Sequence, residues 1–594
     1  MEDNAAPGRQ MQWCAEATAW SVPSGVFRRL STSTLTPAPP GHGGRQARIC
    51  PPGDDTGPCR GLVHRCASAA RRRMAGAWRL LIGDTRPLVP WAVAQLRSIA
   101  GGGSPGHCGA SACPGHLGHA LSVLAQYGQW DAARPACRWL LATQWGDGSF
   151  ADPGRCYAAV ASTAQAVRGL LDIEQNLSPP LAAASPQVDD PALVHDIEAA
   201  VRRACDYLAQ HSDPLRAPRS IPDGPPEMAL AALPCLVLAA RRWHVAAWEE
   251  AARATLSQFR RTIDLAQHVG PTATLADAVE ALLDMHACQP GQAGAVCREL
   301  AREAMALPAA LASREGWVPA CIDPGRRLRP AALAVQAQMA CLWYRLGEYE
   351  PARATLDRVR RQLARDRPAA ERRGRTGSDD LPSISQFLKA SLVEVEASFE
   401  REVCGLPAAI DPRDGRMHVV REWFARLDPR SSLVDAGCGP GRFLAQLAVE
   451  FPAARFTGVD TSSRFVSGLP HGIEGRRGSL LNLPAADGQF DAALAVESLE
   501  HALLAQRAAD ELCRVVRPGG SILIIDKDLA RQGLSEHEPW EQWFAPHEVA
   551  GWLSRHCTDV AVRQVCHVPA YRKRPLFLAW TARRSGSSIG RSIA

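Results

Sequence analysis

The chain has 594 residues, a formal net charge of +6 at pH 7, 46% apolar residues and 22% charged residues, a composition typical of a globular protein of three or four domains. Ten Arg against five acidic residues fall in residues 1–73, so the remainder is nearly neutral and offers no basic surface for a nucleic acid. The longest apolar run, residues 228–240, is too short to cross a bilayer and contains Pro234, which predicts no transmembrane segment.

The cysteines and the amino terminus predict a cytoplasmic protein. The 19 Cys are an odd number scattered singly, which favours reduced thiols over a disulfide framework. Glu2 and Asp3 precede no apolar stretch, so a secretory signal is not expected. Arg greatly outnumbers Lys and Ala is abundant, a bias typical of a GC-rich bacterial genome.

Residues 1–75 are predicted to be a disordered extension, because they are rich in Pro, Gly, Ser and Arg and lack any period. Cys50, Cys59 and Cys66 have spacings that match no zinc module. Alternatively, translation starts at Met74, and residues 1–73 were assigned to the gene in error. Residues 585–594 are likewise predicted to be a disordered tail.

Residues 76–400 are predicted to be helical almost throughout. Apolar residues recur at helical spacing, and Gly, Pro and Asp separate the segments. The predicted helices include residues 119–128, 130–144, 156–173, 226–243, 272–285, 333–347 and 384–395.

Short motifs recur within this helical part. WDAARPAC (130–137), WEEAARATL (248–256) and YEPARATL (349–356) share an aromatic residue followed by Ala-Arg. The loops QWGDGSF (144–150) and REGWVPACID (314–323) are also alike. In the first loop we expect Trp145 to pack over helix ends and Gln144 to bond free backbone groups there. Repeated helical hairpins must stack on one another to bury their apolar faces.

These features resemble the α/α-toroid of terpenoid cyclases and protein prenyltransferases. The catalytic motifs of those enzymes are missing from the sequence. VDDP (188–191) is the nearest run to a DxDD aspartate cluster, there is no Asp-x-Cys zinc pair, and aromatic residues make up only 6% of the chain. The toroid is therefore expected to be a scaffold or an acceptor-binding domain.

One segment of this region gathers metal-binding residue types. GHCGASACPGHLGH (106–119) contains a Cys-x₄-Cys pair and three His. The spacing is loose for zinc, and Pro114 suits the first position of a helix. The start of a helix is therefore favoured, and no metal site is predicted. The residues concerned are His107, Cys108, Cys113, His116 and His119.

The residues with the clearest chemistry lie at 431–460. Residues 431–436 are predicted to form a buried strand, which is followed by Gly437, Gly439 and Gly441 and by a helix from Arg442. Glycines at these places let the backbone approach a ligand and turn sharply. The next predicted strand, 454–460, ends in Asp460, where a carboxylate can accept hydrogen bonds from ribose hydroxyls.

The remainder of the chain completes an alternating pattern of strands and helices. FDAALAVESLEH (490–501) contains a fourth strand, RPGG (517–520) a turn before a fifth strand, and residues 543–556 a helix. Residues 560–567 and 576–584 are predicted to be a closing pair of strands. A dinucleotide site of the type G-x-G-x-x-G is disfavoured, because its third glycine would fall on Leu444.

This order closely resembles the S-adenosylmethionine-dependent methyltransferases of the seven-stranded, Rossmann-like class, over residues 401–584. The expected fold is therefore an all-α toroid (76–400) followed by an α/β Rossmann-like methyltransferase domain (401–584). The resemblance implies S-adenosyl-L-methionine as cofactor. It implies a cofactor site made of Asp435, Gly437, Cys438, Gly439, Gly441, Asp460, Thr461, Ser479, Leu480 and Glu497. Ser479 stands where the family often has an acidic residue.

The residues after the fourth strand are expected to face the transferred methyl group. His501 and Glu497 are the candidate catalytic residues, with His501 as the base for an acceptor hydroxyl or amine. A purely structural role for His501 at a helix start is equally compatible with the motif. The helix at 421–428 is expected to cap the cofactor cleft with Met417, His418 and Glu422.

The predicted function is methyl transfer to an oxygen or nitrogen of a small-molecule, saccharide or lipid-linked acceptor. Two alternatives stay open. In the first, the protein is a bifunctional enzyme that combines a terpenoid- or prenyl-binding activity with the methyltransferase. In the second, it binds S-adenosylmethionine but has lost catalysis. The sequence gives no indication of the oligomeric state.

Overall fold

The structure is a computed structural model that describes most of the chain after residue 87. The described residues are 88–101, 113–150, 159–177, 190–212, 226–289, 291–323, 328–373, 380–402, 406–407, 409–532, 538–566 and 575–586. The predicted extension 1–75, His107 and Cys108 of the candidate metal cluster, and most of the predicted tail lie outside these residues.

The first half of the described chain is helical, as the apolar periodicity predicts. Its helices are α2 (Leu88–Gly101), α3 (Pro114–Gln126), α4 (Trp130–Ala142), α5 (Ala159–Leu177), α6 (Pro191–His211), η1 (Pro226–Ala231), α7 (Ala232–Trp243), α8 (Ala246–Thr262), η2 (Leu265–Gln267), α9 (Thr272–Cys288), α10 (Gln292–Glu315), α11 (Leu333–Leu346), α12 (Tyr349–Arg373) and α13 (Leu381–Glu402). Two short strands, β1 (Gly270–Pro271) and β2 (Cys321–Ile322), pair antiparallel. None of the helices that the structure describes is long and apolar enough to cross a membrane.

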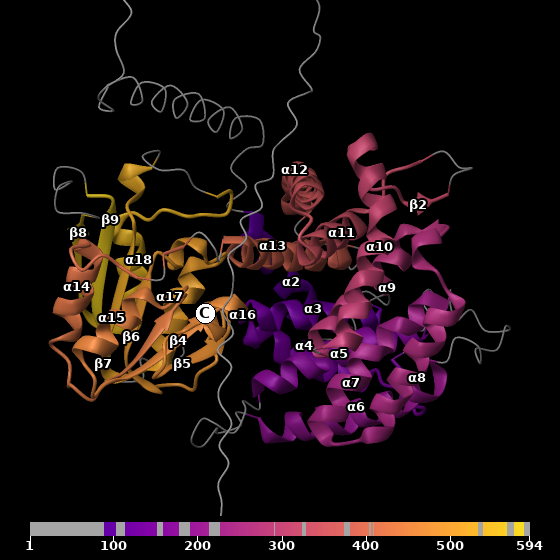
Figure 1. Ribbon diagram of the computed structural model, residues 1–594, viewed down its shortest axis with the longest axis horizontal. Helices are drawn as coiled ribbons and strands as arrows, with labels where there is room; N and C mark the ends of the chain where they lie inside the picture. Colours follow the sequence, from indigo (N-terminus) through magenta and orange to yellow (C-terminus); the bar gives the residue numbers. More distant parts are fainter. Residues whose placement is uncertain are drawn as a thin grey trace, which may run out of the picture. The chain divides into compact units, whose positions relative to one another are not determined.

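The packing of these helices follows their order in the chain. α3, α5, α7, α9, α11 and α13 each pack against the next of the set, and α13 contacts α3 again. α4, α6, α8, α10 and α12 each pack against the helix that precedes them. Figure 1 labels these helices, which are coloured from indigo to red along the chain. In the first of these two sets, α7 and α9 are apolar around most of the helix circumference. This is expected for helices that have neighbours on several sides.

The repeated motifs have a common structural role, because each begins a helix. WDAARPAC opens α4, WEEAARATL lies in the first turns of α8, and YEPARATL opens α12. The QWGDGSF loop matches expectation in part. Gln144 donates to the carbonyl oxygens of Gly148 (3.0 Å) and Ala200 (2.8 Å), as predicted. Trp145 is 53% exposed, so the prediction that its ring covers helix ends is wrong for most of the ring.

Helix α3 begins at Pro114, as predicted. Cys113 is its buried N-cap residue, and its thiol lies 3.6 Å from the Ser162 hydroxyl. This contact joins the start of α3 to α5.

The second half of the chain forms one mixed sheet of seven strands, in the order β5-β4-β3-β6-β7-β9-β8. The strands are β3 (Ser432–Ala436), β4 (Arg455–Asp460), β5 (Ile473–Arg477), β6 (Phe490–Val496), β7 (Val516–Lys527), β8 (Cys557–Val565) and β9 (Phe577–Arg584). β9 runs antiparallel to both β7 and β8, and the other pairs are parallel. The predicted strands and the closing pair are therefore confirmed, and the structure shows that this pair is antiparallel.

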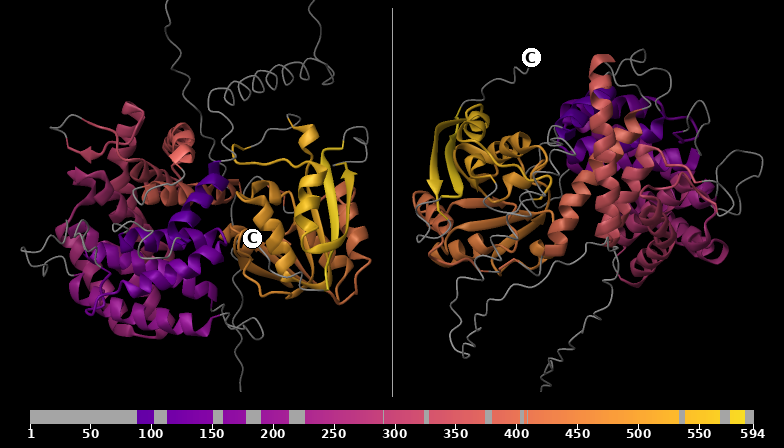
Figure 2. Two further views of the ribbon diagram at one scale, coloured as in Figure 1. Left: turned by 180° about the vertical axis from the view of Figure 1, so that it is seen from behind. Right: turned by 90° about the horizontal axis from the view of Figure 1, so that it is seen from above.

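Helices cover both faces of this sheet (Figure 2). They are α14 (Gly415–Phe424), α15 (Arg442–Glu450), α16 (Ser463–Ser467), α17 (Ala505–Val515) and α18 (Pro546–Leu553), with the short turns η4 (Leu499–His501) and η5 (Leu529–Arg531). Alternate residues of a strand point to opposite faces. Leu433 therefore packs with residues of α14 and α15, and Val434 with residues of α17 and α18.

The RPGG segment differs from the prediction of a turn before the fifth strand. It lies inside β7, where Val516 pairs with Phe490 and the next pairing joins Ser521 to Ala492. Four residues of β7 (517–520) thus lie opposite one residue of β6 (Asp491), so the extra residues form an irregularity of the β-bulge type. Gly519 has a φ of 78° there, a left-handed conformation that favours glycine.

The closest helix contact gives a stability prediction. A Cβ atom at Gly118 of α3 would lie 2.4 Å from the Gln165 carbonyl oxygen and 2.5 Å from the Ala166 Cα of α5. Gly118→Ala must therefore push two backbones apart, and we expect a loss of about 1–3 kcal/mol in the free energy of unfolding. Thermal unfolding followed by circular dichroism measures the loss.

Gly551 provides the matched control. It lies in α18, is exposed, and has no heavy atom within 4 Å of the added Cβ. Gly551→Ala should leave stability unchanged or raise it by about 0.5–1 kcal/mol. Equal stability of the Gly118→Ala variant and the parent protein would contradict the close contact of α3 and α5.

Candidate functional site

The candidate site lies at the carboxyl ends of β3, β4, β6 and β7. The chain crosses from edge strand β5 back to β6, which lies on the other side of β3. Such a reversal of strand order leaves a crevice at the carboxyl ends of the strands, where α/β sheets bind ligands. Asp435, Asp460, Glu497 and Asp526 are at or directly after these strand ends.

The glycine loop after β3 is shaped for close approach. Gly437, Gly439 and Gly441 have φ values of 77°, 53° and 75°, which L-residues with side chains rarely adopt. A Cβ at Gly437 would lie 2.4 Å from the Ser498 Cβ. At Gly439, by contrast, no heavy atom lies within 4 Å of the added Cβ. The loop is therefore packed on the protein at Gly437 and has space beside it at Gly439.

Asp460 connects this loop to the end of β4. Its carboxylate accepts hydrogen bonds from the backbone N–H groups of Gly439 (2.9 Å) and Ser462 (2.9 Å). Burial raises the pKa of Asp460, and the two amide bonds act in the opposite direction. The carboxylate is thus oriented by backbone groups that belong to two different loops.

Asp435 is the most electrostatically unusual group of the loop. Its side chain is buried at the end of β3, and burial followed by the neighbouring charge of Asp460 raises its pKa to about 7, although Arg442 opposes the shift. A buried carboxylate that lacks enough positive charge nearby is a favourable position for a cationic ligand group.

The other predicted cofactor residues surround the same loop in different ways. Cys438 is buried, bonds the Gly439 carbonyl oxygen at 3.4 Å, and has a pKa raised by burial, so its thiol is suited to packing and not to nucleophilic attack. Leu480 approaches Gly437. The Ser479 hydroxyl accepts from the Leu481 N–H at 3.2 Å, which engages it within its own turn. The Thr461 carbonyl oxygen accepts from Arg477.

Glu497 has a strained backbone and two cationic partners. Its φ is 51°, a rare value for a residue with a side chain and one that clusters at functional sites. Its Oε2 atom accepts from Arg416 and, at 3.1 Å, from Arg442. Arg416 is itself held by Asp414 at 2.6 Å. The Glu497 carboxylate is therefore fixed in position beside the glycine loop.

A second charged cluster follows β6 and β7. Lys527 donates to Glu500 (2.8 Å) and to Glu541 (2.7 Å), and all three side chains are largely buried. Burial would raise the pKa of Glu500, but His501, Asp526 and Lys527 together lower it to about 2. Burial and the Glu500 charge raise the pKa of Asp526.

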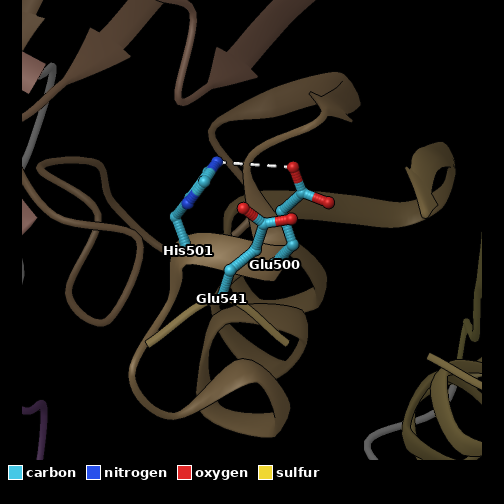
Figure 3. Close-up of side chains that lie close together, drawn as sticks. All are labelled: Glu500, His501 and Glu541. Atoms are coloured by element: carbon cyan, nitrogen blue, oxygen red, sulfur yellow. Dashed lines mark ion pairs between the residues drawn. The ribbon is translucent and has the colours of Figure 1, made fainter. Parts of the chain in front are cut away.

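Glu500, His501 and Glu541 have ligand atoms close enough together to hold a metal ion. Figure 3 shows His501 Nε2 directed at Glu500, at 3.3 Å, with Glu541 beside them. The Lys527 ammonium already bonds both carboxylates, so it provides the positive charge that a metal would bring. The cluster is best described as a lysine-neutralised carboxylate pair.

His501 has an aromatic neighbour and one unsatisfied nitrogen. Its ring packs edge-to-face on Phe399 of α13, with centroids 4.9 Å apart. Its Nδ1 atom has no hydrogen-bond partner among the residues that the structure describes. The ring is therefore held by Phe399 and Glu500, and its second nitrogen is buried.

The structure corrects the expected role of the helix before β3. Within α14, Met417 is fully buried in the core, His418 is exposed and Glu422 is half-buried, and Glu422 pairs with both His418 and Arg563. Trp423 bonds Ser521 near the start of β7. Arg416 is instead the α14 residue that reaches the site, and its 81-residue separation from Glu497 leaves no local sequence signal.

Comparison with known proteins identifies the class of this region. Residues 434–524 match a family model described as a methyltransferase domain. Together with the seven-stranded sheet and the glycine loop, this match defines an S-adenosylmethionine-dependent methyltransferase domain with a Rossmann-like fold. S-adenosylmethionine is the cofactor of that class.

Individual relatives agree with this class. The chain is 34% identical over 119 residues to O-methyltransferase cnsE of Penicillium expansum. This match covers 18% of this chain and 43% of the relative. It is 37% identical over 120 residues to trans-aconitate 2-methyltransferase of an Azoarcus species. This match covers 19% of this chain and 46% of the relative. The chain thus spans less than half the length of these curated relatives. A methyltransferase structure from Aquifex aeolicus is 16% identical, covers 32% of this chain and 98% of its own, and has a TM-score of 0.26.

The raised pKa of Asp435 predicts that cofactor binding depends on pH. Below pH 7 this carboxyl group is mostly protonated, and above pH 7 it is mostly ionised, the form that would attract the ammonium group of S-adenosylhomocysteine. We expect the affinity to rise by up to about tenfold per pH unit from about pH 5.5 to 7 and then to level off. Isothermal titration calorimetry at constant ionic strength measures the profile.

Asp435→Asn is the control for this prediction, because it keeps the shape and removes the titration. It should bind weakly, with no rise in affinity between these pH values.

In the native protein the folded-state pKa of Asp435 lies above its unfolded-state pKa, so this carboxyl group lowers the free energy of unfolding as pH rises from about 4 to 7. Asp435→Asn should therefore lose less stability than the native protein over that range. A flat binding profile for the native protein would contradict the assignment.

Proposed function

We propose that this protein transfers a methyl group from S-adenosylmethionine to an oxygen or nitrogen of a small-molecule, saccharide or lipid-linked acceptor. The observation that carries this proposal is the joint placement of the glycine loop, Asp435 and Asp460 at the carboxyl edge of a seven-stranded sheet. The match of residues 434–524 to the methyltransferase family supports it.

The residues of the loop fit the proposed cofactor. Asp435 would bind the amino group of its methionine part, Asp460 its ribose hydroxyls, and the space beside Gly439 would admit it next to the backbone. Leu480 and Ser479 would lie along its adenine. When bound, this cofactor supplies a methyl group on a sulfonium, which is electrophilic without further activation.

The protein's own task in the reaction is then to position the acceptor and to move a proton. Glu497 is fixed by Arg416 and Arg442 beside the loop, where it would orient the ligand. His501 is the proposed general base, and the support is that its Nδ1 is buried without a hydrogen-bond partner among the described residues. It would accept the proton of an acceptor hydroxyl or amine, and Glu500 would stabilise the resulting imidazolium.

For the helical part we propose an α/α-toroid over residues 76–400 that binds or presents the acceptor, joined to a methyltransferase domain over residues 401–584. The support is the sequence of contacts in which α3, α5, α7, α9, α11 and α13 pack in turn and α13 contacts α3. The repeated motifs that begin α4, α8 and α12 also support it.

Asp460→Ala tests the cofactor site. The substitution removes the carboxylate that orients the Gly439 loop and would bind ribose, so we expect affinity for S-adenosylhomocysteine to fall by about a hundredfold or more. Calorimetric titration of the full chain gives the dissociation constants. Asp487→Ala is the matched control, because Asp487 is an exposed carboxylate outside the loop, and it should bind normally. Unchanged binding by the Asp460 variant would refute the site.

His501→Gln tests the proposed base. On the first acceptor obtained from a screen that follows S-adenosylhomocysteine release, we expect kcat to fall by about 10²- to 10⁴-fold. Cofactor affinity should stay within about twofold. His471→Gln is the control, since His471 is exposed. A loss of less than about threefold in the His501 variant would instead assign His501 a structural role.

A further inference from the structure

The central helices of the helical region have a distinctive pattern of burial. Before their last turns, α5 and α9 bury most of their side chains, and each helix has a half-buried stripe at positions i, i+3 and i+7. Such a pattern means that each helix has neighbours on all sides but one. The stripe of α5 consists of Gln165, Arg168 and Asp172, and that of α9 of Asp277, Glu280 and Asp284.

The stripe residues are polar and bond to one another between helices. Gln338 of α11 donates to Asp277 (2.8 Å) and to Glu280 (2.7 Å). Arg345 of α11 donates to Asp284 at 2.7 Å, and Ser122 of α3 donates to Asp172. Side chains from four different helices thus form linked networks.

Two further ion pairs join helices that are not neighbours in the packing order. Lys389 of α13 pairs with Glu280 of α9, past α11, and Arg168 of α5 pairs with Asp284 of α9 at 3.3 Å, past α7. Contacts of this kind must run through the space that the successive helices surround. We give the name inner polar face to the stripe residues of α5 and α9 together with polar residues of α3, α11 and α13. They are His119, Ser122, Gln165, Arg168, Asp172, Asp277, Glu280, Asp284, Gln338, Arg345, Gln386 and Lys389.

The charges of the inner polar face are matched within the protein. Arg168, Arg345 and Lys389 each have a carboxylate partner. The carboxyl group of Asp277, whose pKa burial raises to about 7, is half protonated near neutrality. A charged ligand would have to break one of these ion pairs, which is costly where the pairs are largely buried.

The unsatisfied atoms of the inner polar face are neutral. His119 Nε2 and Gln386 Oε1 are buried atoms with no hydrogen-bond partner among the described residues. Burial, with a contribution from Lys389, lowers the pKa of His119 to about 3, so its imidazole is uncharged at pH 7. Buried polar atoms without partners indicate groups that await a ligand or water.

We propose that the inner polar face is a binding site for a neutral, polyhydroxylated ligand, that is, a saccharide or the sugar portion of an acceptor. Hydroxyl groups both donate and accept, so they can bond His119, Gln386 and the remaining lone pairs of the carboxylates without displacing any cation. A polyprenyl chain would strip water from these charges without replacing its hydrogen bonds. This inference deepens the proposed acceptor-binding role of the helical region and rests on it.

The test measures binding of six neutral probes to the full-length protein: trehalose, maltose, cellobiose, myo-inositol, methyl α-mannoside and N-acetylglucosamine. Farnesyl diphosphate is the counter-probe. Calorimetry and saturation-transfer NMR report binding without any need for methyl transfer. The variants are His119→Leu and Gln386→Leu, which lie outside the ion pairs and are therefore expected to fold. His195→Leu, an exposed position on α6, is the matched control.

We expect at least one neutral probe to bind and farnesyl diphosphate not to bind. Each variant should weaken that binding by about three- to tenfold, as for the loss of one neutral hydrogen bond, and His195→Leu should not. Absence of binding by all six probes, binding of farnesyl diphosphate alone, or equal binding by both variants and the native protein would overturn the inference. S-adenosylhomocysteine affinity, measured in parallel, shows separately whether the methyltransferase proposal holds.

Discussion

The hydrogen bond from the Gly439 amide to the Asp460 carboxylate is the contact on which the candidate site depends. It joins the loop after β3 to the end of β4, and the second oxygen of the same carboxylate accepts from Ser462 at the start of α16. With both oxygens oriented by backbone groups, the loop is held in its left-handed conformations without a ligand. Asp435 is then buried beside Asp460, and this closeness contributes to its raised pKa.

The site combines two opposite electrostatic arrangements. Around Asp435 and Asp460 the negative charge is incompletely balanced, so this part favours a cation. Around Glu497 and Glu500 each carboxylate has cationic partners, namely Arg416 and Arg442 for Glu497 and Lys527 for Glu500. The glycine loop therefore has an excess of negative charge at the place where the proposed cofactor would put its ammonium group.

Local sequence patterns predicted much of this arrangement. The glycine spacing, the apolar strands and the terminal acids Asp435 and Asp460 are all readable within short windows, and the strands, helix α15 and the seven-stranded order agree with them. Helix periodicity likewise predicted the helices of the first half.

Long-range pairings were beyond such patterns. The partners of Glu497 are Arg416, 81 residues away, and Arg442, 55 residues away, and no spacing rule links them. The bulge at RPGG was missed because a Pro-Gly-Gly run is typical of a free turn, whereas pairing of Val516 with Phe490 extends the strand through it. The inner polar face was missed for a related reason. Single charges at helical spacing normally indicate a solvated surface, and only the packing order of the helices places them on a common inner side.

Helix α13 relates the two proposed sites to each other. Its first half contributes Gln386 and Lys389 to the inner polar face, and its second half contacts the methyltransferase domain through Phe399 against His501 and through Glu400, which accepts from the Ser463 N–H at 2.8 Å. Eleven residues of helix separate Lys389 from Glu400, which is about 17 Å along the axis.

This separation limits the kinds of acceptor that fit both sites. A single sugar ring bound at the inner polar face would be too short to reach the proposed base at His501. An acceptor that uses both sites must therefore be elongated, with its sugar portion among the helices and its methylated atom at the sheet edge. A short ligand at the inner polar face would act on the methyltransferase site only through α13 itself.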